Sequence, residues 1–252
     1  FIIMSQQHQK ETLFPIDLLR FFAASLVVAV HKLSSLITLG YLPLFIQPFT
    51  AFTKYGYLGV DLFFLISGFV ITLSSEGRTV REFISARFIR LYPVFWISTC
   101  ITSGMLLLSQ TPSSPGIGQF FANMTMIPTL ISQYHFIESA CWTLVYELKF
   151  YITISTVLAL QKKTSITPEK LAVFSSPFIL LNALKHSFLS SFAKPLELFV
   201  DILGGVYAQH FMAGILFYAL YKKKRVRFQY LALLLLYLAA LLRTMARSDY
   251  NP

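Results

Sequence analysis

Charged residues are scarce in this sequence. Asp, Glu, Lys and Arg make up 13% of the 252 residues, whereas 56% are hydrophobic and 16% are aromatic. A soluble domain carries about a quarter charged residues, so the composition excludes an ordinary soluble protein and predicts an integral membrane protein. The net charge of +10 lies mainly in short segments between apolar runs. This pattern is typical of orientation signals and of contact with anionic lipid, so we expect a bilayer and not nucleic acid as the partner.

Several chemical signatures are also missing. Only two cysteines occur, Cys100 and Cys141, and we interpret both as small apolar side chains and not as a disulfide framework. The sequence contains no recognised metal-binding motif, no Gly-x-Ser-x-Gly motif of serine hydrolases and no phosphate-binding glycine loop. We also expect no cleavable signal peptide, because Arg20 would interrupt its apolar core.

Long apolar runs dominate what is present. We therefore predict an all-α fold, a polytopic transmembrane helical bundle of about seven spans that forms one domain over residues 1–252. The predicted spans are residues 14–39, 57–73, 91–108, 141–160, 171–184, 196–220 and 228–242. The basic segment 74–90 is expected to form a short interfacial helix. Pro93 would then lie in the first turn of the third span, where proline is tolerated.

The first span carries two polar residues whose spacing places them on the same side of a helix. Arg20 and His31 are eleven residues apart, almost three helical turns, so they point the same way within about 20° and lie about 16 Å apart along the axis. Such residues are costly in a membrane helix unless they face a polar interior, so a functional role is the default interpretation. The alternative is that Arg20 reaches a lipid head group and His31 bonds to a neighbouring helix. Asp17, one turn before Arg20, is placed to pair with it.

The other ionisable residues of the apolar runs that could carry the chemistry are Asp61, Glu147, Asp201 and His210. We interpret Asp201 and His210 as structural hydrogen-bonding residues. The remaining set offers an imidazole as general base, carboxylates to orient it and arginines to bind an anionic ligand. This combination fits group transfer from a phosphate-bearing donor. It fits a proton-coupled transporter or flippase equally well, with Asp61, Glu147 and His31 relaying protons.

Four signatures occur in order along the chain, with a weaker fifth: Arg20-x10-His31, residues 56–69, 87–93 and 142–151, and residues 211–214. This ordered set resembles the membrane-bound acyltransferases called acyltransferase family three. The resemblance implies transfer of an acyl group, most often acetyl, from coenzyme A to a sugar hydroxyl on a cell-surface glycan or lipid carrier. It also implies a bundle of ten helices, so we expect the last helices to be missing from this chain.

The same resemblance implies roles for individual residues. His31 would be the catalytic base, with Glu147 as a second catalytic residue. Donor or acceptor binding would fall to Arg20, Asp61, Arg87, Arg90 and Trp142. No permanently bound cofactor or metal is implied, and acyl-CoA would be the donor substrate. Each arginine could instead serve only to set topology, and Trp142 could serve only as an interfacial anchor.

Loop charges predict the orientation in the plasma (inner) membrane. Basic residues gather at 74–90, 161–170 and 221–227, whereas 109–140 contains no Lys or Arg. By the positive-inside rule the N-terminus is cytoplasmic and 109–140 is external. Arg243 and Arg247 fit this scheme less well and would suit an additional partial helix.

The orientation is testable by cysteine labelling in a background in which Cys100 and Cys141 are replaced. A cysteine introduced at Ser113 should react with a membrane-impermeant maleimide on intact cells, whereas a cysteine at Thr79 should react only after the membrane is permeabilised. The reverse pattern would overturn the predicted orientation.

Overall fold

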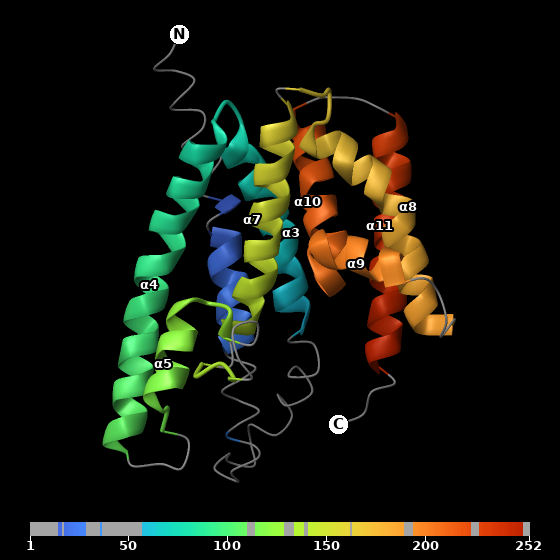
Figure 1. The fold of residues 1–252 in the computed structure, drawn as a ribbon. Coiled ribbons are helices and arrows are strands. Elements are labelled where there is room, and N and C mark those ends of the chain that lie inside the picture. The colour runs from blue at the N-terminus through green and yellow to red at the C-terminus, as the bar shows by residue number, and fades with distance from the viewer. Residues whose placement is uncertain are drawn as a thin grey trace. The chain divides into compact units, whose positions relative to one another are not determined.

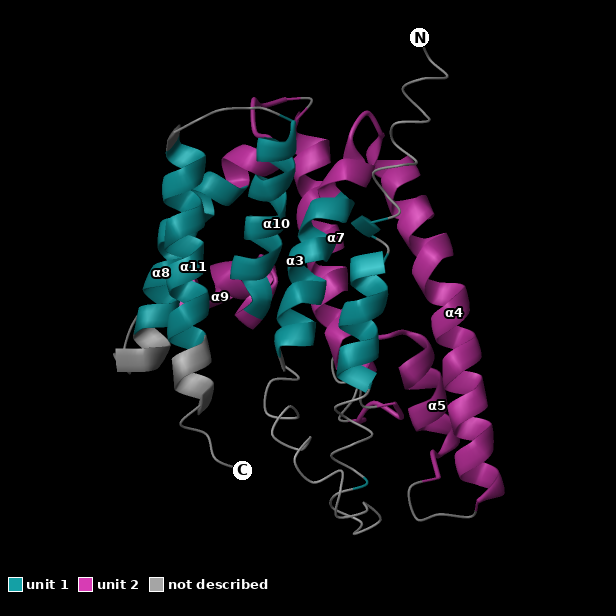
Figure 2. Ribbon diagram, turned by 180° about the vertical axis from the view of Figure 1, so that it is seen from behind, with its two compact units in different colours: residues 1–71, 172–192, 207–252 teal, residues 72–171, 193–206 magenta. Residues whose placement is uncertain are grey.

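The computed structural model confirms the all-α prediction for the part of the chain that it describes, in which no strand occurs (Figure 1). The described residues are 15–16, 18–28, 36, 57–109, 114–128, 134–138, 141–161, 163–188, 194–222 and 227–248. The chain divides into two compact units (Figure 2). Unit 1 comprises residues 1–71, 172–192 and 207–252, and unit 2 comprises residues 72–171 and 193–206.

Fewer helices qualify as membrane spans than the sequence predicts. Three described helices are long and apolar enough to cross a bilayer: α3 (Tyr57–Ser75), α4 (Val80–Leu108) and α7 (Trp142–Gln161). A fourth is counted if the interrupted pair of residues 194–202 and 205–221 forms one span. The predicted fifth span is helical as α8 (Pro168–Phe188) but is not among these candidates. The count of seven is therefore not confirmed.

Helix α4 in unit 2 departs most from the sequence prediction. It is a single helix of 29 residues, so the predictions of an interfacial helix followed by a separate span, with Pro93 in its first turn, are wrong. A capping box starts the helix, with the Thr79 backbone N–H donating to Glu82 Oε2 at 2.8 Å and the Thr79 side chain accepting from the Glu82 backbone N–H. Beyond the cap, one buried stripe continues on both sides of Pro93, formed by Phe83, Arg87, Phe95, Thr99 and Ser103. Packing along this stripe offsets the cost of proline inside a helix.

Unit 2 is completed by shorter elements beside α4 and α7. Helix α5 (Ile117–Met124) lies alongside α4 (Figure 1), and the Trp96 indole N–H donates to the Met124 carbonyl at 2.9 Å. Helix α9 (Lys194–Ile202) packs on α7. These contacts anchor the helices that carry Arg87 and Glu147.

The predicted sixth span is interrupted. Helix α9 ends at Ile202, the 3-10 turn η3 (Gly205–Tyr207) follows, and α10 (Ala208–Tyr221) begins a new helix. Gly204 and Gly205 adopt φ values of 125° and 60°, which glycine reaches without steric cost and other residues rarely adopt. The continuous helix expected over 196–220 is therefore wrong, and the reason is local to this glycine pair.

The core of unit 1 is built on a close backbone contact between α3 and α10. The buried rings of Phe64 and Phe211 lie 5.0 Å apart. Beside them, a Cβ at Gly68 would overlap the Phe211 backbone, and a Cβ at Gly214 would overlap the Leu65 carbonyl. Small residues that let helix backbones approach are a common means of packing helices in membranes.

Further helices belong to unit 1, among them most of α8. The helix Leu18–Val28 packs against the start of α3, where Gly59 meets Ala23 and Val27. Helix α11 (Arg227–Ser248) packs on α10. Arg243 and Arg247 lie on α11 itself, and the side of the membrane on which they lie stays a prediction.

The close contact between α3 and α10 predicts that Gly68 and Gly214 do not tolerate a larger residue. Gly214→Ala and Gly68→Ala should each lower the thermal midpoint of the detergent-solubilised protein by roughly 5 °C or more, because the added methyl group overlaps backbone that cannot rotate away. Gly104→Ala on α4 is the matched control, since its Cβ would meet nothing within 4 Å. Equal midpoints for all three variants would show that the backbones do not approach this closely.

Candidate functional site

Arg20 in unit 1 is held against α3. It is half-buried on the helix Leu18–Val28, its Nη2 donates to Ser67 Oγ at 3.1 Å, and its guanidinium lies 5.5 Å from the centroid of the Phe63 ring. The side chain therefore turns toward the protein and does not extend toward a lipid head group. His31 and Asp17 lie outside the described residues, so the polar stripe from Arg20 to His31 and the Asp17–Arg20 pair stay predictions.

Asp61 has a neighbour that the sequence interpretation missed. His210 on α10 places its Nε2 3.6 Å from Asp61 Oδ1 on α3, and both side chains are largely buried. A carboxylate next to an imidazole fixes the orientation of the ring and stabilises its protonated form. His210 is visible in the sequence as an ionisable residue within an apolar run and was interpreted there as structural. Its pairing with Asp61 could not be predicted, because about 150 residues separate the two.

Glu147 in unit 2 is buried at 4% exposure within α7. Its Oε1 accepts a hydrogen bond from the Tyr151 hydroxyl, one turn further along the helix, at 2.6 Å. The guanidinium of Arg87 on α4 lies 5.7 Å from the centroid of the same tyrosine ring and 5.6 Å from that of Phe83. One tyrosine thus stands between a buried cation and a buried anion, which is how two desolvated charges remain tolerable inside a protein.

The two arginines that were grouped in the sequence lie in different environments. Arg87 is buried at 6% exposure and donates through Nη2 to Ser74 Oγ. Arg90 is exposed, as are Arg78 and Arg81 nearby. Arg90 therefore stays a candidate for a soluble anionic donor, whereas Arg87 faces the space between α4 and α7.

That space is a pocket of about 500 Å³ within unit 2. Arg87 and Tyr151 line it, together with the polar side chains of Tyr92, Ser155 and Thr156 and with apolar side chains of both helices. Trp142 is not among its lining residues. It is half-buried at the start of α7, where its ring meets that of Tyr146 edge-to-face at 5.8 Å.

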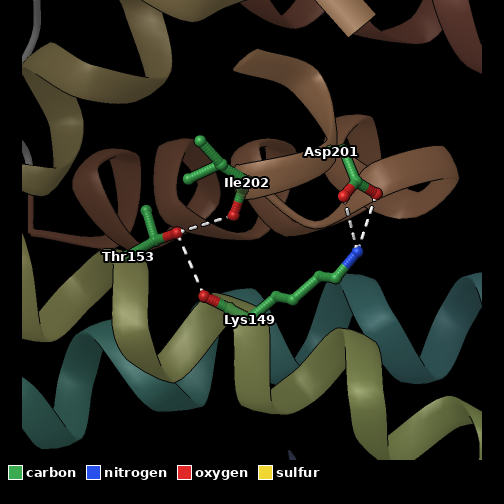
Figure 3. A network of polar contacts seen from close by, with 4 residues as sticks. All are labelled: Lys149, Thr153, Asp201 and Ile202. Atoms are coloured by element: carbon green, nitrogen blue, oxygen red, sulfur yellow. Dashed lines mark hydrogen bonds and ion pairs between the residues drawn. The ribbon is translucent and has the colours of Figure 1, made fainter. Parts of the chain in front are cut away.

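A second polar cluster joins α7 to α9 (Figure 3). Lys149 Nζ donates to both carboxylate oxygens of Asp201, at 2.7 and 2.8 Å. Thr153 Oγ1 lies 3.1 Å from the Lys149 carbonyl and 3.0 Å from the Ile202 carbonyl, so its hydroxyl serves both. These contacts hold the end of α9 just before the glycine pair, which agrees with the structural interpretation of Asp201.

Metal and thiol chemistry receive no support from the described residues. They contain no group of three or more His, Cys, Asp and Glu side chains that could hold a metal ion. Burial, with a smaller contribution from Glu138, raises the pKa of the Cys141 thiol to about 11. A raised pKa disfavours the thiolate, which is the nucleophilic form of cysteine.

Comparison with known proteins adds a family match. A family model described as an acyltransferase domain matches residues 15–248. The Exopolysaccharide production protein ExoZ of Rhizobium meliloti (strain 1021) is 32% identical over 102 residues, which cover 38% of this chain and 32% of that protein. Acyltransferase MdmB of Streptomyces mycarofaciens is 26% identical over 124 residues, 45% of this chain and 31% of that protein.

A third relative is Nodulation protein 10 of Rhizobium leguminosarum bv. viciae, 27% identical over 170 residues, 58% of this chain and 44% of that protein. The matched regions span less than half the length of each of these three relatives. No solved structure matches the chain.

Loss of the hydrogen bond from Tyr151 to Glu147 should lower the stability of the folded protein. Tyr151→Phe keeps the ring beside Arg87 but leaves the buried carboxylate without this donor, at a cost of about 1–3 kcal/mol. The thermal midpoint in detergent should fall, whereas Tyr237→Phe, at a ring that is 64% exposed on α11, should leave it unchanged. If both variants have the same thermal midpoint as the wild type, the Tyr151 hydroxyl does not stabilise the Glu147 carboxylate.

Proposed function

Because the chain belongs to the acyltransferase domain family, whose model it matches over residues 15–248, we propose that it transfers an acyl group from acyl-coenzyme A to a sugar hydroxyl of a polysaccharide or lipid-linked glycan. The match over nearly the whole chain is the observation that carries this proposal. Acetyl is the acyl group most often used by the family that the ordered signatures resemble. The name of the relative from Rhizobium meliloti supports a glycan as the acceptor.

The donor is proposed to bind on the cytoplasmic side. Its phosphates need cations that water can reach, and Arg78, Arg81 and Arg90 are exposed around the start of α4. The same segment is predicted to be cytoplasmic by its charge, and coenzyme A is a cytoplasmic molecule. Arg20, with its N–H groups directed at α3, is proposed to support the donor arm further along.

His31 is proposed as the general base of the transfer. The hydroxyl oxygen of the acceptor attacks the thioester carbonyl carbon, and the hydroxyl proton passes to the neutral imidazole. When the carbon–sulfur bond breaks, the imidazolium returns that proton to the departing sulfur, so no net proton is released. Glu147 is proposed to orient this base or the acceptor, with Asp61 and Trp142 contributing to substrate binding.

A proton-coupled carrier is the second candidate. The observation that favours it is the Asp61–His210 pair, since buried carboxylate–imidazole pairs are typical of proton relays in transporters. A carrier would move its substrate without consuming acyl-coenzyme A, so the two functions separate in a single assay.

We expect His31→Ala to lower consumption of acetyl-coenzyme A by about 10²–10⁴-fold, as loss of a general base does, in membranes containing the full-length protein. Glu147→Gln should lower it sharply while the protein still inserts. Glu82→Gln is the matched control, because Gln can also complete the capping box at an exposed site.

Release of free coenzyme A with an added glycan acceptor is the measurement, normalised to the amount of inserted protein. Wild-type turnover in His31→Ala would show that the base is assigned wrongly. Glycan movement without coenzyme A release in the unmodified protein would favour the carrier instead.

A further inference from the structure

The pocket between α4 and α7 exposes mainly apolar surface, although Tyr92, Ser155 and Thr156 also line it. Its volume of about 500 Å³ falls within the range of small-molecule sites. It extends along the first turns of α4 and the second half of α7, and both of these helices qualify as membrane spans. Its apolar walls include Ile84, Phe88, Leu91, Leu148, Ile152 and Ala159. A hollow of this kind matches an alkyl chain better than a polar substrate.

Arg87 brings buried hydrogen-bond donors to the wall of the pocket. Arg87 is only 6% exposed to solvent. Its Nη2 donates a hydrogen bond to Ser74 Oγ. Its Nε and Nη1 make no hydrogen bond of ordinary geometry within the described part of the chain, although the Tyr151 hydroxyl lies near enough to interact with the guanidinium. Buried guanidinium donors without acceptors are costly, so a ligand that brings oxygen atoms to this wall would be stabilised there.

Exposed apolar side chains form the rim of the pocket. Ile84, Phe88 and Ile152 line it and are 50%, 46% and 58% exposed. Large apolar side chains exposed on membrane-spanning helices contact lipid chains and not water. A ligand therefore has direct access from the membrane.

The charge around the pocket is positive. Arg78, Arg81 and Arg90 are exposed near it. Arg78 also lines a second hollow of about 240 Å³, which shares Val80 with the pocket. The neighbouring carboxylates are already engaged, because Glu82 caps α4 and Glu147 accepts from Tyr151. The surface thus favours an anionic head group.

We propose that the pocket is a binding site for an anionic membrane phospholipid. One acyl chain lies between α4 and α7, and the ester or phosphate oxygens accept from Arg87 Nε and Nη1. This inference goes beyond the proposed function and does not depend on it. A lipid held here would brace the two helices that carry Arg87, Tyr151 and Glu147.

The test uses the full-length protein purified in mild detergent, with bound lipid counted by native mass spectrometry. Phosphatidylglycerol and phosphatidylcholine with identical acyl chains are titrated separately. Phosphatidylglycerol should bind about tenfold more tightly, since one charge-assisted hydrogen bond is of that order. Arg87→Gln should remove this preference, whereas Arg90→Gln, on the exposed side of the same helix, should retain most of it.

A second variant keeps the proposal testable if Arg87→Gln fails to fold. Ala159→Phe fills the pocket from an exposed position and should weaken binding of both lipids, whereas Ala24→Phe, exposed on another helix, should not. Equal binding of the two lipids by the wild-type protein would overturn the proposal. The proposal would also be overturned if equimolar palmitoyl-coenzyme A displaced phosphatidylglycerol and the lipid did not rebind, because the pocket would then be the donor site.

Discussion

The structure depends on one constraint, which is that charged side chains on apolar helices must find partners inside the protein. Removing a charge from water is tolerable only when hydrogen bonds and an opposite charge compensate. Arg87, Tyr151 and Glu147 meet this requirement across α4 and α7. The other described cases are Arg20 with Ser67 and Asp61 with His210, whereas the Lys149–Asp201 pair lies at the surface. Each of these contacts also fixes how two helices lie side by side within a unit.

Close helix packing follows from a second membrane property. Lipid tails are as apolar as the helices, so association relies on van der Waals contact and not on exclusion of water. Gly68 and Gly214 permit that contact in unit 1, where side chains would hold α3 and α10 apart. Gly204 and Gly205 use the freedom of glycine differently, to end one helix and begin another next to the Lys149–Asp201 pair.

The separation of Arg87 from Arg90 links the fold to the proposed chemistry. Three residues apart on a helix, the two side chains do not share an environment, because one enters the α4–α7 interface and the other remains outside. Exposed arginines can meet the phosphates of a soluble donor at little cost. A buried arginine must be satisfied locally, and its open donors direct it to the pocket. The exposed and buried arginines of this basic segment are thus proposed to have distinct tasks.

How much could be foreseen follows from the range of each interaction. Apolar composition, the spans at α3 and α7, and the order of the signatures are properties of consecutive residues, so the sequence by itself determined the all-α membrane class and the family. It also marked Glu147 and Asp61 as unusual, because a charge in an apolar run is visible without a structure.

Tertiary structure decided what depends on partners far along the chain. Pro93 predicts the start of a helix, yet α4 continues through Pro93 because residues on both sides of it are buried by packing. Asp61 acquires His210, and Arg87 acquires Ser74 and the Tyr151 ring, through helices brought together by folding. The physical reason is that burial and pairing of a charge are set by neighbours in space, and a single sequence records only neighbours along the chain.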